Sequence, residues 1–167
     1  MKIDRRTLLG GMAAAALAGP VFARKGPAPA WYSNSIIVDG LGGISDPYGA
    51  DGELRLTDRA WSEMRTTGIS AVRDTLLPVG NIADSWEKFS KGLDDYHNQL
   101  AANPDRLVLV EKAADIPAAR KAGKIGIILG TQDSAMVGPA LDRLAEMQKR
   151  GVRAVQLTYN LANLSGD

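Results

Sequence analysis

KIGIILGTQDSAMVGPALDRLAEMQKRGVRAVQLTYNLANLSGD (residues 124–167) is the stretch that decides the fold. Ile125 to Leu129 form a continuous apolar run, which is typical of a strand buried on both faces. Val152 to Thr158 predict a second buried strand. Between them, Gly138-Pro139 predicts the start of a helix and Gly151 its end. A strand, a helix and a further strand in this order predict neighbouring parallel strands, whose C-terminal ends are the usual place for a site.

The helix in this stretch is expected to pack through one apolar stripe. Leu141, Leu144 and Met147 are three residues apart, so they fall on one side of a helix. We therefore predict that all three side chains face the sheet.

The rest of the chain repeats the alternation of strands and helices. The regular spacing predicts a mainly parallel α/β sheet of four or five strands. No helix follows the last strand, so we expect the N-terminal half of a TIM-type (β/α)8 barrel over residues 36–167, truncated after its first four or five strands. The further predicted strands cover residues 35–40, 69–76 and 107–110, and the further predicted helices cover residues 57–67, 85–102 and 116–122. At the end of the second strand, the pair Arg73-Asp74 is expected to form a salt bridge.

The composition excludes several kinds of site. The 167 residues are 45% hydrophobic and 23% charged, as expected of a globular domain. There is no cysteine, which excludes disulfides, thiolate metal ligands and cysteine nucleophiles. His97 is the only histidine, which excludes a metal site built mainly from imidazoles of this chain. The formal net charge is +1 and no basic block is present, so we expect no nucleic-acid partner.

The first 35 residues are predicted to lie outside the folded domain. Arg5-Arg6-Thr7-Leu8-Leu9 has the form of a twin-arginine signal, and Val21-Phe22-Ala23 suits cleavage after residue 23. Residues 1–23 are therefore predicted to be a Tat signal peptide, with an uncleaved anchor as the alternative. The Pro-rich residues 24–35 are predicted to be a flexible leader. We expect the Tat export machinery to be a partner and the protein to be periplasmic or extracellular.

Polar side chains cluster where the predicted strands end. We expect the side chains that follow Leu129 and Leu157 to point into one shared pocket, because neighbouring parallel strands end at the same edge. The polar residues at the ends of the predicted strands, that of residues 35–40 included, are Asp39, Gln132, Asp133, Tyr159, Asn160 and Asn163.

Three segments together resemble the membrane (renal) dipeptidase family. They are Val38-Asp39-Gly40, residues 123–130 and residues 151–160, in this order and at this spacing. The resemblance implies a metal-dependent, amidohydrolase-type barrel that binds two zinc ions. It also implies cleavage of dipeptides by a metal-activated water.

Four positions depart from the motifs of that family. Leu41 and Gly43 stand where the family has a histidine and an aspartate as metal ligands, and neither can bind zinc. Gln132 replaces the metal-bridging glutamate, and Tyr159 replaces a histidine that stabilises the transition state. Asp133 is the neighbouring carboxylate that could substitute as a metal ligand. The resemblance therefore leaves one Zn²⁺ ion or none.

The resemblance also assigns roles to the remaining polar residues. Asp133 is expected to bind metal and Tyr159 to donate to the oxyanion, so these two are the catalytic candidates. Gln132, Asn160 and Asn163 are expected to bind the substrate, a dipeptide or peptide-like small molecule. Each residue has a plainer alternative role. Asp39 fits a turn or a residue behind the site better than a ligand, Gln132 and Asp133 fit the capping of backbone groups, and the two asparagines fit loop stabilisation.

Three functions follow from this sequence. The first is an exported metal-dependent dipeptidase-like hydrolase. The second is an inactive homologue that binds peptides or cell-wall fragments, and the third is a truncated, non-functional fragment. A homodimer is the candidate assembly.

Overall fold

The computed structural model describes residues 29–166. The predicted signal peptide and residues 24–28 of the predicted leader lie outside the described residues. The chain divides into two compact units, Met1–Ser33 and Asn34–Asp167. The last part of the predicted leader contains the short helix α2 (Ala30–Asn34) where the sequence predicted a flexible segment. Of the helices in the described part, none has the length and apolar character needed to cross a membrane.

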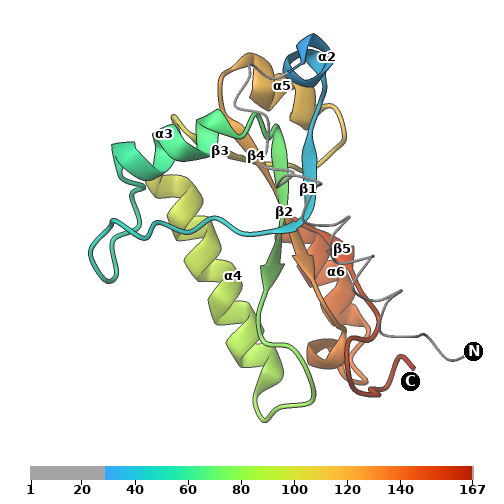
Figure 1. Ribbon diagram of the computed structural model, residues 1–167. Coiled ribbons are helices and arrows are strands. Elements are labelled where there is room, and N and C mark those ends of the chain that lie inside the picture. The colour runs from blue at the N-terminus through green and yellow to red at the C-terminus, as the bar shows by residue number, and fades with distance from the viewer. Residues whose placement is uncertain (1–28, 167) are drawn as a thin grey trace, which may run out of the picture. The chain divides into compact units, whose positions relative to one another are not determined.

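The second unit contains a five-stranded sheet in which every pairing is parallel (Figure 1). The strand order is β1-β2-β4-β3, and β5 also pairs with β4. β3 pairs with the first part of β4, and β5 pairs with its last part. This arrangement confirms the predicted α/β class and agrees with the first strands of a TIM-type barrel. The strands are β1 (Val38–Gly42), β2 (Ala71–Leu76), β3 (Leu107–Leu109), β4 (Ile125–Thr131) and β5 (Val152–Val155).

Helices lie between consecutive strands along the chain, as predicted. Thr57 caps the first of them, because its side-chain oxygen accepts a hydrogen bond from the backbone N–H of Ala60 at 3.2 Å. The last helix ends before Gly151, whose φ of 96° suits a glycine after a helix. The helices between strands are α3 (Asp58–Thr66), α4 (Ser85–Ala102), α5 (Asp115–Lys121), the 3₁₀ turn η1 (Ala135–Val137) and α6 (Asp142–Lys149).

The core lies where α4, β4 and α6 meet. Phe89 and Leu93 from α4, Ile127 and Leu129 from β4, and Met147 from α6 are fully buried. Complete burial of each such side chain contributes about 1.5–3 kcal/mol to folding. The apolar run that predicted β4 is therefore the centre of this core.

Three elements differ from the prediction by three or more residues at one end. β1 begins at Val38 and runs to Gly42, so it starts three residues later than predicted. β5 ends at Val155, three residues before Thr158. α6 begins at Asp142 because Gly138 adopts a positive φ of 57°, which ends η1 and prevents a continuous helix from that position.

The predicted apolar stripe of α6 is wrong for two of its three residues. Met147 is buried, but Leu141 and Leu144 are 71% and 41% exposed. The inward-facing positions are Arg143, Met147 and Arg150, which are four and three residues apart.

Both arginines of this face contact α4 through their guanidinium groups. Arg143 lies over the Trp86 ring, 4.7 Å from its centroid. Arg150 donates to the Ser90 hydroxyl at 2.7 Å and to the Asp94 carboxylate at 2.6 Å. Half-buried arginines therefore replace the expected leucines, because their aliphatic stems pack while their charged ends find partners.

The predicted salt bridge between Arg73 and Asp74 is also wrong. Successive side chains of a strand point to opposite faces of the sheet, so neighbours in sequence do not meet. Asp74 is buried and accepts hydrogen bonds from the backbone N–H groups of Ile44 at 2.9 Å and Thr75 at 2.7 Å. Arg73 donates instead to the backbone oxygen of Thr131 on β4.

Candidate active site at the strand ends

The segments that follow β4 and β5 are held together by one backbone oxygen. Leu157 O accepts hydrogen bonds from the Ser134 N–H at 3.3 Å, from the Ser134 hydroxyl at 2.9 Å and from Asn163 Nδ2 at 2.8 Å. Because β4 and β5 are parallel neighbours, both segments leave the sheet at the same edge. The two Ser134 bonds therefore keep the two segments side by side, and the Asn163 bond stabilises the segment after β5.

Asp133 lies two residues after the end of β4 and is only 3% exposed. Its Oδ1 accepts a hydrogen bond from the Ala135 N–H at 3.0 Å, and its Oδ2 accepts one from the Gly80 N–H in the loop after β2. A buried carboxylate needs such donors, because burial without them carries a large free-energy cost. The predicted alternative role for Asp133, satisfying backbone groups, is therefore correct.

The same carboxylate also lines a cavity of about 160 Å³ at the strand ends. Tyr159 and Asn160, from the segment after β5, line it together with Asp133. The predicted shared pocket is thus present for these three residues. Its volume is below the range of about 300–1,000 Å³ that is usual for ligand pockets, so it has room for part of a dipeptide. The other lining residues are Val79, Gly80 and Leu161.

The remaining predicted site residues do not line this cavity. Gln132 is half-buried and lies outside it. Asn163 supports its own loop, since it bonds Leu157 O and accepts from the Ser165 N–H at 2.7 Å. Asp39, the second residue of β1, accepts from the Leu41 N–H at 3.0 Å, the bond typical of a local Asx turn. A local turn describes Asp39 and loop stabilisation describes Asn163, while substrate binding by Asn163 stays a prediction.

The residues present do not fit a zinc centre. Leu41 is 58% exposed at one family ligand position, and Gly43 offers no side chain at the other. Within residues 29–166, no three His, Cys, Asp or Glu side chains come close enough to hold a metal ion. His97, the only histidine, uses Nε2–H to donate to Arg150 O at 2.9 Å. The described residues thus do not by themselves supply a metal site at Asp133.

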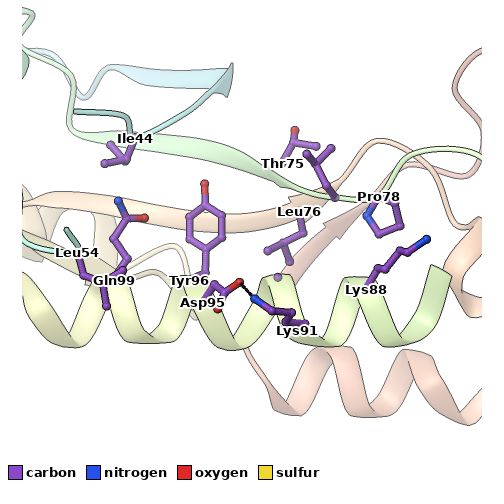
Figure 2. Close-up of a pocket in the computed structure, with 12 residues that line it drawn as sticks. Ile44, Leu54, Thr75, Leu76, Pro78, Lys88, Lys91, Asp95, Tyr96 and Gln99 are labelled. Carbon is purple, nitrogen blue, oxygen red and sulfur yellow. Dashed lines mark hydrogen bonds and ion pairs between the residues drawn. The ribbon is translucent and has the colours of Figure 1, made fainter. Parts of the chain in front are cut away.

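A larger cavity, of about 690 Å³, lies elsewhere, between α4 and the end of β2 (Figure 2). Its walls are mainly apolar, and Tyr96 projects from α4 toward β2 in its centre. Lys91 and Asp95 form an ion pair of 2.6 Å at its rim. Burial and the nearby Asp74 carboxylate raise the pKa of the Tyr96 phenol, so it stays protonated. The sequence gave no sign of this cavity.

The two lysines that line this larger cavity are both engaged. Lys88 donates to the backbone oxygen of Ala83 at 2.9 Å, and Lys91 is paired with Asp95, so neither serves as a free base. None of the polar residues predicted for the strand ends reaches it. The smaller cavity at Asp133 is therefore the better candidate for chemistry, despite its size.

The sequence comparison identifies the family. Residues 57–167 match the membrane dipeptidase family, peptidase family M19. The chain belongs to the membrane dipeptidase family. The match covers the whole segment from α3 onward, including residues 123–130 and 151–160, and confirms the predicted family. A search among curated proteins gives no match to this dipeptidase-family chain.

Two solved structures from Pseudomonas aeruginosa resemble this family member. An amidohydrolase is 25% identical, with a TM-score of 0.63. The probable dipeptidase PvdM is 13% identical, with a TM-score of 0.64, and this likeness supports the fold alone. In both cases the match covers 80% of this chain and 37% of the other. The chain thus spans well under half the length of the structures it resembles.

Proposed function

We propose that this membrane dipeptidase family member is an exported hydrolase that acts on dipeptides or similar peptide-like molecules at the Asp133 cavity. The observation that supports the proposal most is that Asp133, Tyr159 and Asn160 line one cavity at the strand ends. The export part of the proposal rests on the twin-arginine pattern at Arg5-Arg6.

Asp133 is the residue proposed to act on water. Its two backbone hydrogen bonds fix the carboxylate, so it needs no reorganisation when a ligand enters. Each carboxylate oxygen has a second lone pair that remains available for a water proton. In this role Asp133 serves as a general base toward a water beside the peptide carbonyl.

Tyr159 and Asn160 are proposed to bind the peptide group. Tyr159 is 51% exposed and offers a phenolic O–H, which can donate to the oxygen on which negative charge develops. Asn160 offers both a donor and an acceptor, as a peptide bond requires. The part of zinc in this chemistry stays a prediction from the family, and no step here is assigned to it.

The test is hydrolysis of a panel of dipeptides by the full chain, with and without added zinc. Asp133→Asn is expected to lower kcat/KM by about 100-fold or more, and Tyr159→Phe by about 10- to 100-fold. Tyr48→Phe is the matched control, because Tyr48 bonds Glu63 and lies outside the cavity. If no dipeptide is cleaved under either condition, the hydrolase proposal fails.

Binding without cleavage is the second candidate function. Leu41 and Gly43 favour it, because they remove the ligands on which the chemistry of the family depends. Calorimetric titration with dipeptides separates the two candidates. Saturable binding without turnover supports a binding protein, and turnover excludes it.

A further inference from the structure

Within residues 29–166, Arg73 is a half-buried cation without a carboxylate partner. It points away from Asp74, which lies on the opposite face of β2 and is occupied by backbone N–H groups. Among residues 29–166, Arg73 forms no ion pair. A partly desolvated guanidinium is more stable with an anion beside it, so an arginine without one is a candidate binding group.

The guanidinium of Arg73 is held against β4 by two features. Its Nη2 donates to the backbone oxygen of Thr131, the last residue of β4. Gly130 leaves room for it, because a Cβ at that position would lie 2.6 Å from Arg73 Nε. The side chain is therefore positioned by the sheet.

This position is at the edge where the candidate site lies. Thr131 O also accepts a hydrogen bond from the N–H of Gln156, the residue that follows β5, at 3.2 Å. Arg73 thus contacts Thr131 at the junction of β4 and β5. Thr131 is two residues before Asp133 in the chain.

Donor groups remain unused at this place. A guanidinium has five N–H donors, and Arg73 uses one of them in the hydrogen bonds of the described residues. Thr75 is two residues further along β2, so its side chain is on the same face as Arg73. Its hydroxyl is buried and has no hydrogen-bond partner within residues 29–166. Donors of this kind match the lone pairs of a carboxylate.

We propose that Arg73, assisted by Thr75, binds the carboxylate of a small ligand at the edge of the sheet. A free organic acid and the C-terminus of a dipeptide present the same group. The second of these sources rests on the proposed function, in which the carboxylate end of the peptide lies at Arg73 and its amide at Asp133. Arg73 is then a binding residue that selects ligands with a free terminus.

The test is a titration of the full chain with N-acetylglycine and with its uncharged counterpart N-acetylglycinamide. The acid is expected to bind, and the amide to bind at least about 10-fold more weakly, because it lacks the charge that Arg73 recognises. Acetate distinguishes the sources. Affinity for acetate equal to that for N-acetylglycine assigns the site to small acids, and tighter binding of N-acetylglycine assigns it to peptide termini.

Variants test whether Arg73 carries this binding. Arg73→Gln is expected to weaken N-acetylglycine about 10- to 100-fold. Arg73→Lys keeps the charge but loses the planar fork, so an intermediate loss is expected, and this variant serves if Arg73→Gln does not fold. Arg153→Gln is the matched control, because Arg153 on β5 is already paired with Glu111 at 3.3 Å.

The proposal is overturned if acid and amide bind equally, if the wild type binds neither, or if Arg73→Gln binds the acid as the wild type does. These outcomes do not depend on catalysis. If the wild type cleaves no dipeptide, the proposed hydrolase function fails. Arg73-dependent binding of N-acetylglycine would still support the carboxylate site.

Discussion

The buried carboxylate of Asp133 accepts a hydrogen bond from the backbone N–H of Gly80, 53 residues earlier in the chain. This bond ties the loop after β2 to the end of β4. The second oxygen of Asp133 accepts from Ala135 and fixes the turn toward η1. The group proposed for chemistry therefore also holds the loops that form its cavity.

Asp133→Ala is expected to lower the free energy of unfolding by about 2–4 kcal/mol. The substitution leaves the N–H groups of Gly80 and Ala135 without their acceptor in a buried place, which is the costly way to lose a hydrogen bond. Urea unfolding of both proteins measures the difference. Asp51→Ala, at an exposed loop position, is the control and should stay within about 0.5 kcal/mol. Equal stability of Asp133→Ala and wild type would contradict the described bonds.

Asn103→Ala is expected to destabilise the protein by about 3 kcal/mol. Asn103 is fully buried after α4, where Nδ2 donates to Leu54 O at 2.7 Å and Gln99 O at 2.8 Å, and Oδ1 accepts from the Leu56 N–H at 2.9 Å. Alanine removes all three bonds and leaves buried backbone groups unpaired.

Thermal or urea unfolding checks this value against Asn98→Ala, a substitution at an exposed position of α4. That control should be neutral or slightly stabilising, because alanine has the higher helix propensity. If Asn103→Ala lowers the free energy of unfolding no more than Asn98→Ala does, the Asn103 side chain does not connect the segment of Leu54 and Leu56 to α4.

The free energy of unfolding is expected to fall in acid, partly because the Asp46 carboxylate becomes protonated. Partial burial acts to raise the pKa of this carboxyl, but hydrogen bonds from Thr57, Tyr48 and Gly49 outweigh it and lower the pKa below its ordinary value of 3.8. A depressed carboxyl pKa gives a stability contribution that is present above the ordinary pKa and is lost as the pH falls through the folded-state pKa.

Asp46→Asn removes this contribution. The variant should therefore melt at a lower temperature than the wild type at neutral pH, and the two melting temperatures should converge in strong acid. Melting curves across this pH range measure the gap. A gap that stays constant with pH would assign the effect to hydrogen-bond geometry and not to ionisation.

Two glycine substitutions are expected to change stability in opposite directions. Gly92 lies inside α4 beside the larger cavity, and a Cβ there would have its nearest neighbour, Leu77 O, at 3.4 Å. Gly92→Ala should stabilise the protein by up to about 1 kcal/mol through helix propensity. Gly126→Ala should destabilise it by about 1–3 kcal/mol, because its Cβ would lie 2.7 Å from Val110 Cγ2. Urea unfolding of both variants gives the signs, and equal signs would contradict this prediction.

The sequence predicted the parallel sheet because its strongest signals act over short distances. The apolar run of β4 and the capping residue Thr57 each specify local structure without help from the rest of the chain. Gly151 ends α6 for the same reason. Alternating elements then restrict the topology to parallel strands.

The failed predictions concern choices that depend on distant partners. Leu141 and Leu144 have the right spacing to pack, but Arg143 and Arg150 face inward because α4 offers Trp86, Ser90 and Asp94 to them. A helical wheel does not contain the identity of the opposing surface. Asn103 does follow the last residue of α4, but its complete burial depends on its bonds to Leu54 and Leu56, far away in the sequence.

The candidate site was predictable where strand direction alone decided the outcome. Asp133, Tyr159 and Asn160 meet because β4 and β5 are parallel neighbours. Gln132 lies outside the cavity, since consecutive residues leave the strand end in different directions. The predicted pair of Arg73 and Asp74 does not form, because strand alternation places their side chains on opposite faces of β2.

β4 is the strand on which β2, β3 and β5 all pair, two of them along successive parts of one edge. Opening β1, β3 or β5 breaks one strand pairing and opening β2 breaks two, whereas opening β4 breaks three. Its amide protons should therefore be among the slowest to exchange with deuterated solvent, at rates set by global unfolding. The short strands β3 and β5 should exchange earlier, through local fluctuations that leave the rest of the sheet formed.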